Sequence, residues 1–366
     1  MINYRDPDAP PLMMIAANPT GQESAVSFRF QLFDPAGATS SEIAAHVNLA
    51  RACAAADRPS EPAPTYDSVV VSLSTGMSGR GRPNVWTAHR GEHLVGKGIV
   101  SLPADENTDL SLIDVQVHPE HRRRGIGTGL LQRMMPTITT PGRVTVASWT
   151  TIEDTPAAHW ARHLGFRVTK RVVVQALDLE TVDRGLWELP APAGYRLAHW
   201  RDSAPEHLVE SFAAARNAIN DTPIGDLTLQ IPQWTVDRVR REEAVLRDRN
   251  VEQHVVVAVH EQSNRVAGLT ALQFYSPDAP LGYQHDTAVL AGHRGLGLGA
   301  VVKAAMLRLI SAERPATRRL VTSTDAEQAP ARRMNQRVGF EPVRTAIVVE
   351  TPATDLAARV RAAQPL

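Results

Sequence analysis

Residues 121–127 read His-Arg-Arg-Arg-Gly-Ile-Gly, and residues 293–299 read His-Arg-Gly-Leu-Gly-Leu-Gly. In both places an alternating apolar run precedes the glycines, and an apolar helical pattern follows them. Glycines at a strand-to-helix junction let the backbone curl so that consecutive N–H groups face one point. The helix that follows adds its positive end, so such a junction can hold a pyrophosphate. The repeated pattern predicts two phosphate-binding loops and a small charged ligand.

The sequence downstream of each loop repeats as well. Pro156 and the pair Gly165-Phe166 recur in the second half as Pro330 and Gly339-Phe340. A single Gly-x-Gly before a helix is more often only a helix start and a close packing point. Strand, glycine loop, strand, Pro-initiated helix and Gly-Phe end, repeated in one order, indicate instead an internal repeat. We therefore expect two copies of one domain.

The composition fits an ordinary globular protein. Its 43% hydrophobic and 21% charged residues are typical of soluble globular proteins, and a length of 366 residues suggests about two or three domains. The formal net charge of +0 gives no bulk attraction to nucleic acid or to an acidic membrane. The chain shows neither a membrane-length apolar run nor a signal-peptide pattern, and its single Cys53 rules out an internal disulfide. These features predict a soluble, cytoplasmic protein. The His residues show no metal-ligand spacing, so we expect no metal.

The order of the expected elements divides the chain. An irregular lead-in at residues 1–24 precedes a first domain at 25–188, and a Pro-rich linker at 189–194 leads to a second domain at 195–366. Each domain is expected to be α+β, with a mixed, mostly antiparallel sheet flanked by helices. In the first domain, the apolar stretch Asp67–Leu73 is expected to be a strand.

This pattern resembles the GNAT superfamily, the acyl-CoA-dependent N-acyltransferases. The family's diagnostic loop reads Arg/Gln-x-x-Gly-x-Gly/Ala, and this chain matches it twice. The matching residues are Arg122, Gly125 and Gly127 in the first half, and Arg294, Gly297 and Gly299 in the second. The resemblance spans roughly residues 25–355. The tandem arrangement is similar to that of the two-domain type that includes mycothiol synthase and related actinobacterial acetyltransferases.

The resemblance implies how each domain binds acetyl-CoA, the acyl donor. The strand before the loop splays from its neighbour, and pantetheine lies along it as an added strand would. Val117 and Val289 then offer backbone groups to the thioester end. The loop amides hold the pyrophosphate, while Arg122, Arg124 or Arg294 pairs with the outer phosphates or forms a solvated basic face. The residues implied to bind CoA are Val117, Arg122, Arg123, Arg124, Gly125, Ile126, Gly127, Val289, Arg294, Gly295, Leu296, Gly297, Leu298 and Gly299.

The resemblance also implies direct attack of an amine on the thioester. Such a reaction uses a base for the ammonium proton, N–H groups facing the carbonyl oxygen, and an acid for the departing thiolate. In this family a Tyr often serves as the acid. The positions for that Tyr are Ala161 and Asn335 here, so the chain departs from the pattern in both halves.

Strand alternation supplies other candidates in the second half. It places Tyr283, His285 and Thr287 on the face of Val289, whereas the equivalent positions of the first half are mostly apolar. His285 is the candidate base near neutral pH, and Tyr283 the candidate acid or hydrogen-bond donor. Simple packing of these side chains is the alternative.

The acceptor wall has one candidate segment. Asn220 and Asp221 follow the first helix of the second domain, where GNAT folds usually place the acceptor. An Asx turn explains the same residues equally well. The expected partners are CoA and a small-molecule amine, with no membrane partner.

The expected function is an acetyl-CoA-dependent N-acetyltransferase. The second half is the choice for the chemistry, although the more basic first loop leaves the reverse division open. Two alternatives keep the fold. One is transfer of an aminoacyl group from aminoacyl-tRNA, which needs a local basic surface. The other is a non-catalytic CoA-binding protein, which the two missing tyrosines support.

Overall fold

The computed structural model describes residues 27–74, 81–221, 228 and 230–363, so the expected lead-in lies outside the described residues. The strands of the first half are β1 (Arg29–Phe33), β2 (Pro83–Arg90), β3 (His93–Ser101), β4 (Leu110–Val117), β5 (Thr145–Ile152) and β6 (Arg167–Asp178). Its helices are α1 (Ser40–Asp57), α2 (Tyr66–Ser74), α3 (Ile126–Ile138) and α4 (Pro156–His163).

The second half repeats this order and adds one helix at its end. Its strands are β7 (Tyr195–Arg201), β8 (Glu252–His260), β9 (Arg265–Phe274), β10 (Leu281–Val289), β11 (Arg319–Asp325) and β12 (Glu341–Pro352). Its helices are α5 (Glu206–Arg216), α6 (Val236–Asp248), α7 (Leu298–Glu313), α8 (Ala329–Arg337) and α9 (Ala353–Ala362). The repeat and the α+β class expected from the sequence are confirmed.

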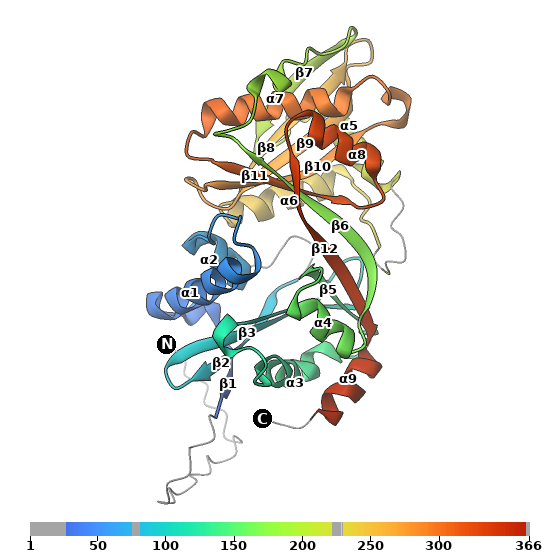
Figure 1. The fold of residues 1–366 in the computed structure, drawn as a ribbon. Coiled ribbons are helices and arrows are strands. Elements are labelled where there is room, and N and C mark those ends of the chain that lie inside the picture. The colour runs from blue at the N-terminus through green and yellow to red at the C-terminus, as the bar shows by residue number, and fades with distance from the viewer. Residues whose placement is uncertain (1–26, 75–80, 222–227, 229, 364–366) are drawn as a thin grey trace, which may run out of the picture.

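All twelve strands form one sheet, in the order β1-β2-β3-β4-β5-β12-β6-β11-β10-β9-β8-β7. The last strand of each half is exchanged: β12 pairs with β5 of the first half, and β6 pairs with β11 of the second. The two exchanged strands also pair with each other, and Figure 1 shows them crossing between the halves as long ribbons. Each half of the sheet is therefore completed by chain from the other half.

The exchange extends to the two cores. Leu356 and Val360 of α9 are buried together with Leu130 and Met134 of α3 in the core of the first half. In the opposite direction, Trp187, which follows β6, is buried beneath α7 and donates from Nε1 to a carbonyl oxygen at 3.0 Å. Neither core is complete without side chains from the end of the other half.

The expectation of a strand at Asp67–Leu73 is wrong, because the structure has helix α2 there. The run of valines in this segment favours a strand by propensity. In the helix, however, Val69 and Leu73 lie one turn apart and are both buried against α1 and β2. A hydrogen bond of 3.2 Å from the amide of Ser68 to the hydroxyl of Thr65 also caps the first turn. Packing on one side of the segment outweighs its propensity.

The helix connectors reach across to the other half. Ser60, between α1 and α2, accepts a hydrogen bond from Arg319 of β11, and this connector lies below the second half in Figure 1. Conversely, Gln230 ahead of α6 exchanges two hydrogen bonds with Asn107 of the first half, at 3.0 and 2.6 Å. In each half, the face of the sheet opposite α3 or α7 is therefore bordered by residues of the other half.

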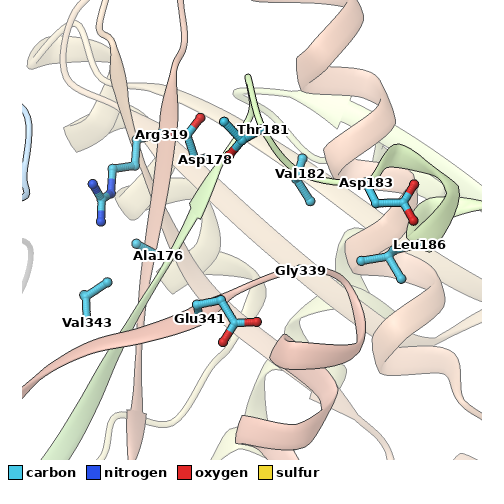
Figure 2. A pocket seen from close by; sticks show the side chains of 10 residues that line it. All are labelled: Ala176, Asp178, Thr181, Val182, Asp183, Leu186, Arg319, Gly339, Glu341 and Val343. Atoms are coloured by element: carbon cyan, nitrogen blue, oxygen red, sulfur yellow. The ribbon is translucent and has the colours of Figure 1, made fainter.

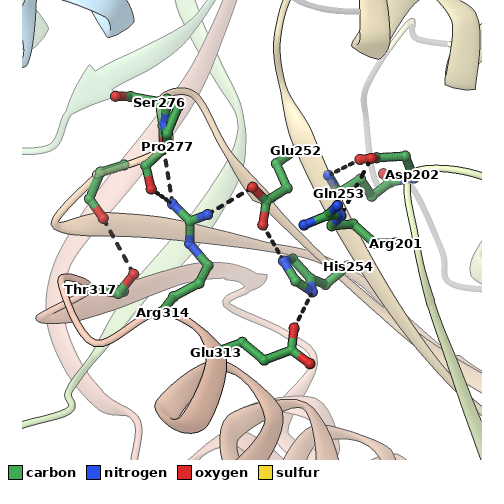
Figure 3. Close-up of polar contacts among 11 residues, drawn as sticks. Arg201, Asp202, Glu252, Gln253, His254, Ser276, Pro277, Glu313, Arg314 and Thr317 are labelled. Carbon is green, nitrogen blue, oxygen red and sulfur yellow. Dashed lines mark hydrogen bonds and ion pairs between the residues drawn. The ribbon is translucent and has the colours of Figure 1, made fainter.

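A buried polar network ties the end of α7 to the sheet (Figure 3). Glu252 at the start of β8 binds His254 Nε2 at 2.5 Å and Arg314 Nη1 at 2.8 Å. Arg314 directly follows α7 and also donates to the carbonyl oxygens of Ser276 and Pro277. The network holds the C-terminal end of α7 and thereby helps to fix the position of its N-terminal end.

Acidification is expected to weaken this network. Burial raises the pKa of Glu252, but hydrogen bonds and charge from His254 and Arg314 outweigh it and hold that pKa below its ordinary value of 4.5. A folded-state pKa below the unfolded one stabilises the fold above about pH 4.5, and the benefit is lost as the pH falls. Glu252→Gln should therefore cost about 1–3 kcal/mol at pH 7 and progressively less below pH 4.5, as measured by urea unfolding. The exposed Glu261→Gln is the control, and an unchanged difference at low pH would contradict the assignment.

Candidate functional site

The strand that precedes each loop parts from its parallel neighbour partway along. β4 pairs with β5 only as far as Leu112, and β10 pairs with β11 only as far as Gln284. We call residues 113–117 the first splay and residues 285–289 the second splay. Within the described residues, neither segment has a partner strand on this side. Backbone groups there can pair with an extended ligand.

Each splay leads into a loop with the same backbone shape. In the first loop Arg123 and Gly125 have positive φ angles of 64° and 76°, and in the second loop Gly295 and Gly297 have φ angles of 83° and 77°. Gly125 and Gly297 each stand immediately before the loop helix, α3 or α7. Each loop thus has two left-handed positions separated by one residue, and glycine, which occupies three of these four positions, adopts this conformation without steric cost.

The loops leave backbone donors uncovered. Gly129 donates the first full-turn hydrogen bond of α3 to Gly125 at 2.9 Å, so the amides of residues 126–128 lie ahead of the helical ladder. In the second loop, a Cβ added to Gly295 or Gly297 would meet no atom within 4 Å, so the backbone there faces open space. Such amides, at the positive end of a helix, suit an anionic group.

The first arginine of each motif closes its loop onto the strand. Arg122 donates from Nε to the carbonyl oxygen of Val117 at 3.1 Å, and Arg294 donates in the same way to Val289 at 3.0 Å. The carbonyl groups that the family resemblance assigns to the thioester end therefore accept hydrogen bonds from within the protein. The Val117 oxygen also accepts a hydrogen bond from Cys53 Sγ at 3.5 Å, whereas the second lone pair of the Val289 oxygen can accept a further donor.

The same two guanidinium groups also pair with aspartates. Arg122 forms a bidentate pair with Asp57 at the end of α1, with N–O distances of 2.8 and 2.6 Å. Arg294 pairs with Asp221 at the end of the 3-10 helix Asn217–Asp221. The resemblance assigns the arginines to phosphates and Asp221 to the acceptor, and the structure joins them in a repeated contact between loop and helix. The side chain of the neighbouring candidate, residue 220, lies outside what the structure describes.

The other residues of the CoA set fall into two groups. Those exposed at the loops are Arg123, Arg124, Gly125, Gly295, Leu296 and Gly297. Those packed at the start of a loop helix are Ile126, Gly127, Leu298 and Gly299. The exposed group is free to meet a ligand, whereas the packed group fixes the helix under the loop.

A bulge interrupts the second splay. Between Gln284 and Thr287, β10 has one residue more than β9. Thr270 Oγ1 of β9 lies 2.8 Å from both Gln284 Nε2 and Thr287 Oγ1, so these side chains share one face. The expectation that Tyr283, His285 and Thr287 lie on a common face is wrong, because the extra residue reverses the alternation before Thr287.

Tyr283 and His285 lie on the other face, toward α5. Asp286, beside His285 in the bulge, binds Arg216 of α5 at 2.8 Å. His285 Nε2 is shielded from solvent and has no hydrogen-bond partner among the described residues. Burial lowers the pKa of His285, Asp286 opposes this effect, and Arg216 adds to it. The Tyr283 ring packs 5.1 Å from that of Tyr275, and burial raises the pKa of Tyr283 to about 12.

Arg216 is a site residue that its sequence pattern does not reveal. It is 8% exposed and forms ion pairs with Asp286 and with Glu242 of α6. Its guanidinium lies 3.3 Å from the ring centre of Trp234, which exchanges two hydrogen bonds with Asn217. In the sequence, an Arg in the last turn of a helix is explained by the helix dipole alone. The burial that distinguishes Arg216 appears only in the fold.

The positions of the usual acidic Tyr are filled by structural residues. Ala161 is packed in the core of the first half. Asn335 is 2% exposed and donates to Gln175 at 2.9 Å and to Thr324 at 3.0 Å. Neither residue has a group that releases a proton near neutral pH.

A cavity of about 410 Å³ opens where the exchanged strands begin and end (Figure 2). Asp178 and Glu341 line it from β6 and β12, and Asp183 and Leu186 line it from the turn after β6. Its lining includes none of the loop or splay residues. It is therefore separate from the two candidate sites.

Within the described residues, no helix is both long enough and apolar enough to cross a bilayer.

Comparison with known proteins agrees with this geometry. Residues 81–168 match the acetyltransferase (GNAT) domain and residues 197–340 the acetyltransferase (GNAT) family. A tandem GNAT protein from the clavulanic acid biosynthesis pathway is 24% identical, with a TM-score of 0.73 over 89% of this chain and 99% of that one. A GCN5-related N-acetyltransferase from Sphaerobacter thermophilus is 18% identical, with a TM-score of 0.63 over 89% of this chain and 96% of that one. No curated protein gives a significant match.

At these identities the structural likenesses establish the fold, and the two family matches cover both loops. The chain belongs to the GNAT acetyltransferase family and is an acyltransferase with two GNAT domains in tandem.

Proposed function

We propose that the protein is an acetyl-CoA-dependent N-acetyltransferase that acetylates the amine of a small molecule by direct attack on the thioester. One observation carries the proposal: in both halves a splayed strand leads into a loop of the same backbone shape, and the first amides of the next helix lie ahead of its hydrogen-bond ladder. Acetyl-CoA supplies an activated acyl group when it is bound. The protein contributes the backbone groups that orient this donor and the side chains that receive the proton of the amine.

The test is turnover by the full chain with acetyl-CoA and a panel of small primary amines. The expected result is thiol release that depends on the amine, together with a product heavier than the amine by one acetyl group. Acetyl-CoA that binds without any thiol release would favour the non-catalytic CoA-binding protein.

For the second splay we assign the base to His285. Its Nε2 has no hydrogen-bond partner among the described residues, and its lowered pKa keeps the ring neutral near pH 7, which is the form that accepts a proton. Tyr283, whose raised pKa keeps it protonated, is the proposed hydrogen-bond donor on the same face. Thr287 lies on the other face, where its bond to Thr270 supports the shape of the bulge.

Replacing His285 by Ala is expected to lower kcat/KM by about 10²–10⁴-fold, the usual contribution of a positioned base. Because the pKa of His285 lies below its ordinary value of 6.5, wild-type activity should fall only on acidification below that value. The variant should lose this limb of the pH profile. His207→Ala, an exposed histidine on α5, is the matched control. An unchanged pH profile in His285→Ala would remove His285 from the reaction.

A further inference from the structure

Glu350 lies on the exchanged strand β12, at the foot of the first splay. It is opposite Ala147 of β5, and Ala147 is opposite Leu112, the last residue of β4 that pairs with β5. Residues opposite one another on neighbouring strands point to the same face. Val349, the adjacent residue of β12, belongs to the core beneath α3. Glu350 therefore lies on the face away from α3, beside the point where β4 and β5 part.

The carboxylate of Glu350 is buried and only partly bonded. Glu350 is 5% exposed. Its Oε2 accepts a hydrogen bond of 3.1 Å from Thr228 Oγ1, whereas its Oε1 is shielded from solvent and has no partner among the described residues. A buried acceptor that lacks a donor is costly, and more so when it is charged. An oxygen in this position suits a ligand that brings a donor or a cation.

The charged groups around Glu350 do not supply a donor to its Oε1. Burial raises its pKa, the bonds to Thr228 and the charge of Arg167 lower it, and Asp109 raises it again, with a net shift upward. Arg167 is opposite Glu350 on β6, but its side chain forms no ion pair with Glu350 among the described contacts.

The equivalent face of the second half has different chemistry. There β11 pairs with β6, and the residues of β6 opposite Val321 and Ser323 are the apolar Ala176 and Val174. The titratable group at the second splay is instead His285, on β10 itself. Strand exchange thus supplies the first half with a carboxylate that the repeat does not contain.

We propose that the first splay is a second acceptor site, in which Glu350 binds the ammonium group of a cationic primary amine through Oε1 and accepts its proton. The inference rests on the proposed function, because it requires an acyl thioester at the first loop. One ammonium proton passes to Glu350, the amine nitrogen forms a bond to the acyl carbon, and the carbon–sulfur bond breaks. The departing thiolate then takes up a proton, so the products are an amide, CoA and one released proton.

Binding can be tested without the donor. Among the 13C-labelled glutamate carboxyl carbons, one group that titrates above the ordinary range should disappear in Glu350→Gln, whereas Glu242, whose pKa burial also raises, should remain. n-Butylammonium should lower the pKa of this group, because a bound cation favours the carboxylate. Tetramethylammonium, which has no N–H donor, should not do so at equal ionic strength. Equal effects of the two cations, or no effect of either, would overturn the amine site.

Catalysis is tested in a His285→Ala background, so that turnover reports on the first splay. The His285→Ala background should keep only the acidic limb that belongs to Glu350. Adding Glu350→Gln should lower kcat/KM for n-butylamine by about 10²–10⁴-fold and remove this remaining limb. Glu341→Gln, exposed on the same strand, should leave both unchanged. Thr228→Val should move the acidic limb to higher pH, because it removes a bond that lowers the pKa of Glu350.

The two proposals fail in different ways. A Glu350 pKa that n-butylammonium lowers, without any turnover of acetyl-CoA, would support the amine site and contradict the proposed function. Turnover that Glu350→Gln leaves unchanged, with the same pH profile, would contradict the role of Glu350 and retain the function.

Discussion

Leu356→Ala in α9 is expected to destabilise the first half of the protein, although the residue lies near the C-terminal end of the chain. Leu356 is 0% exposed and packs in the core of α3. Truncation of a fully buried Leu costs about 2–5 kcal/mol through lost burial and the cavity left behind. Because α9 contacts α3 and β5, the loss should appear there. Deletion of α9 and the residues after it should have a larger effect of the same kind.

Hydrogen exchange on the full chain measures this prediction. Amides of α3 and β5 should lose protection in Leu356→Ala before those of α7 and β8 do. Leu32→Ala on β1 is the control, because Leu32 is 57% exposed and its truncation removes little buried surface. Loss of protection confined to the second half would contradict the exchange of core segments between the halves.

Features that depend on local sequence could be predicted. The glycine loops follow from backbone requirements at single positions, and the structure reproduces them twice with nearly the same φ angles. The hairpins at β2–β3 and β8–β9 follow from alternating runs separated by a short turn. Cys53 lies in an Ala-rich helical pattern of the sequence; it is 7% exposed in α1, and burial raises the pKa of its thiol.

The strand exchange could not be predicted in this way. β6 and β12 each follow a Gly-Phe helix end, and each is an apolar run that can pair beside either β5 or β11. The alternation of side chains fixes which face is buried, but it does not identify the neighbouring strand. The choice depends on contacts far apart in sequence, such as that of Leu356 with α3.

The side chains at the splays show the same limit. One additional residue in β10 separates Thr287 from His285, and strict alternation has no means of placing such a bulge. Glu350 belongs to the second half by its place in the sequence. Only the pairing of β12 with β5 places it opposite Ala147, whose other neighbour is Leu112 of β4. The residue types indicate which side chains can transfer a proton, but only the fold shows where these side chains lie.

Gly297→Val is expected to weaken CoA binding at the second loop by about tenfold to a hundredfold. A β-branched residue at φ 77° costs about 1–3 kcal/mol, and each 1.4 kcal/mol is a factor of about ten. A Cβ at Gly297 meets no atom within 4 Å, so the effect comes from the backbone and not from a clash. At Gly299, by contrast, a Cβ would lie 2.6 Å from Met334 Sδ, which would mix packing with binding.

The two loops provide the control for this measurement. Arg123 adopts φ 64° at the position of Gly295, so a side chain is tolerated there, and Gly295→Asn should bind CoA nearly as wild type does. Calorimetric titration of Gly297→Val, Gly125→Val and the double variant then assigns the binding to each half. If each single variant loses a different class of CoA sites and the double variant loses both classes, each loop holds CoA by its backbone. If CoA binding survives in the double variant, the amides do not hold the pyrophosphate, and the loop assignment is wrong.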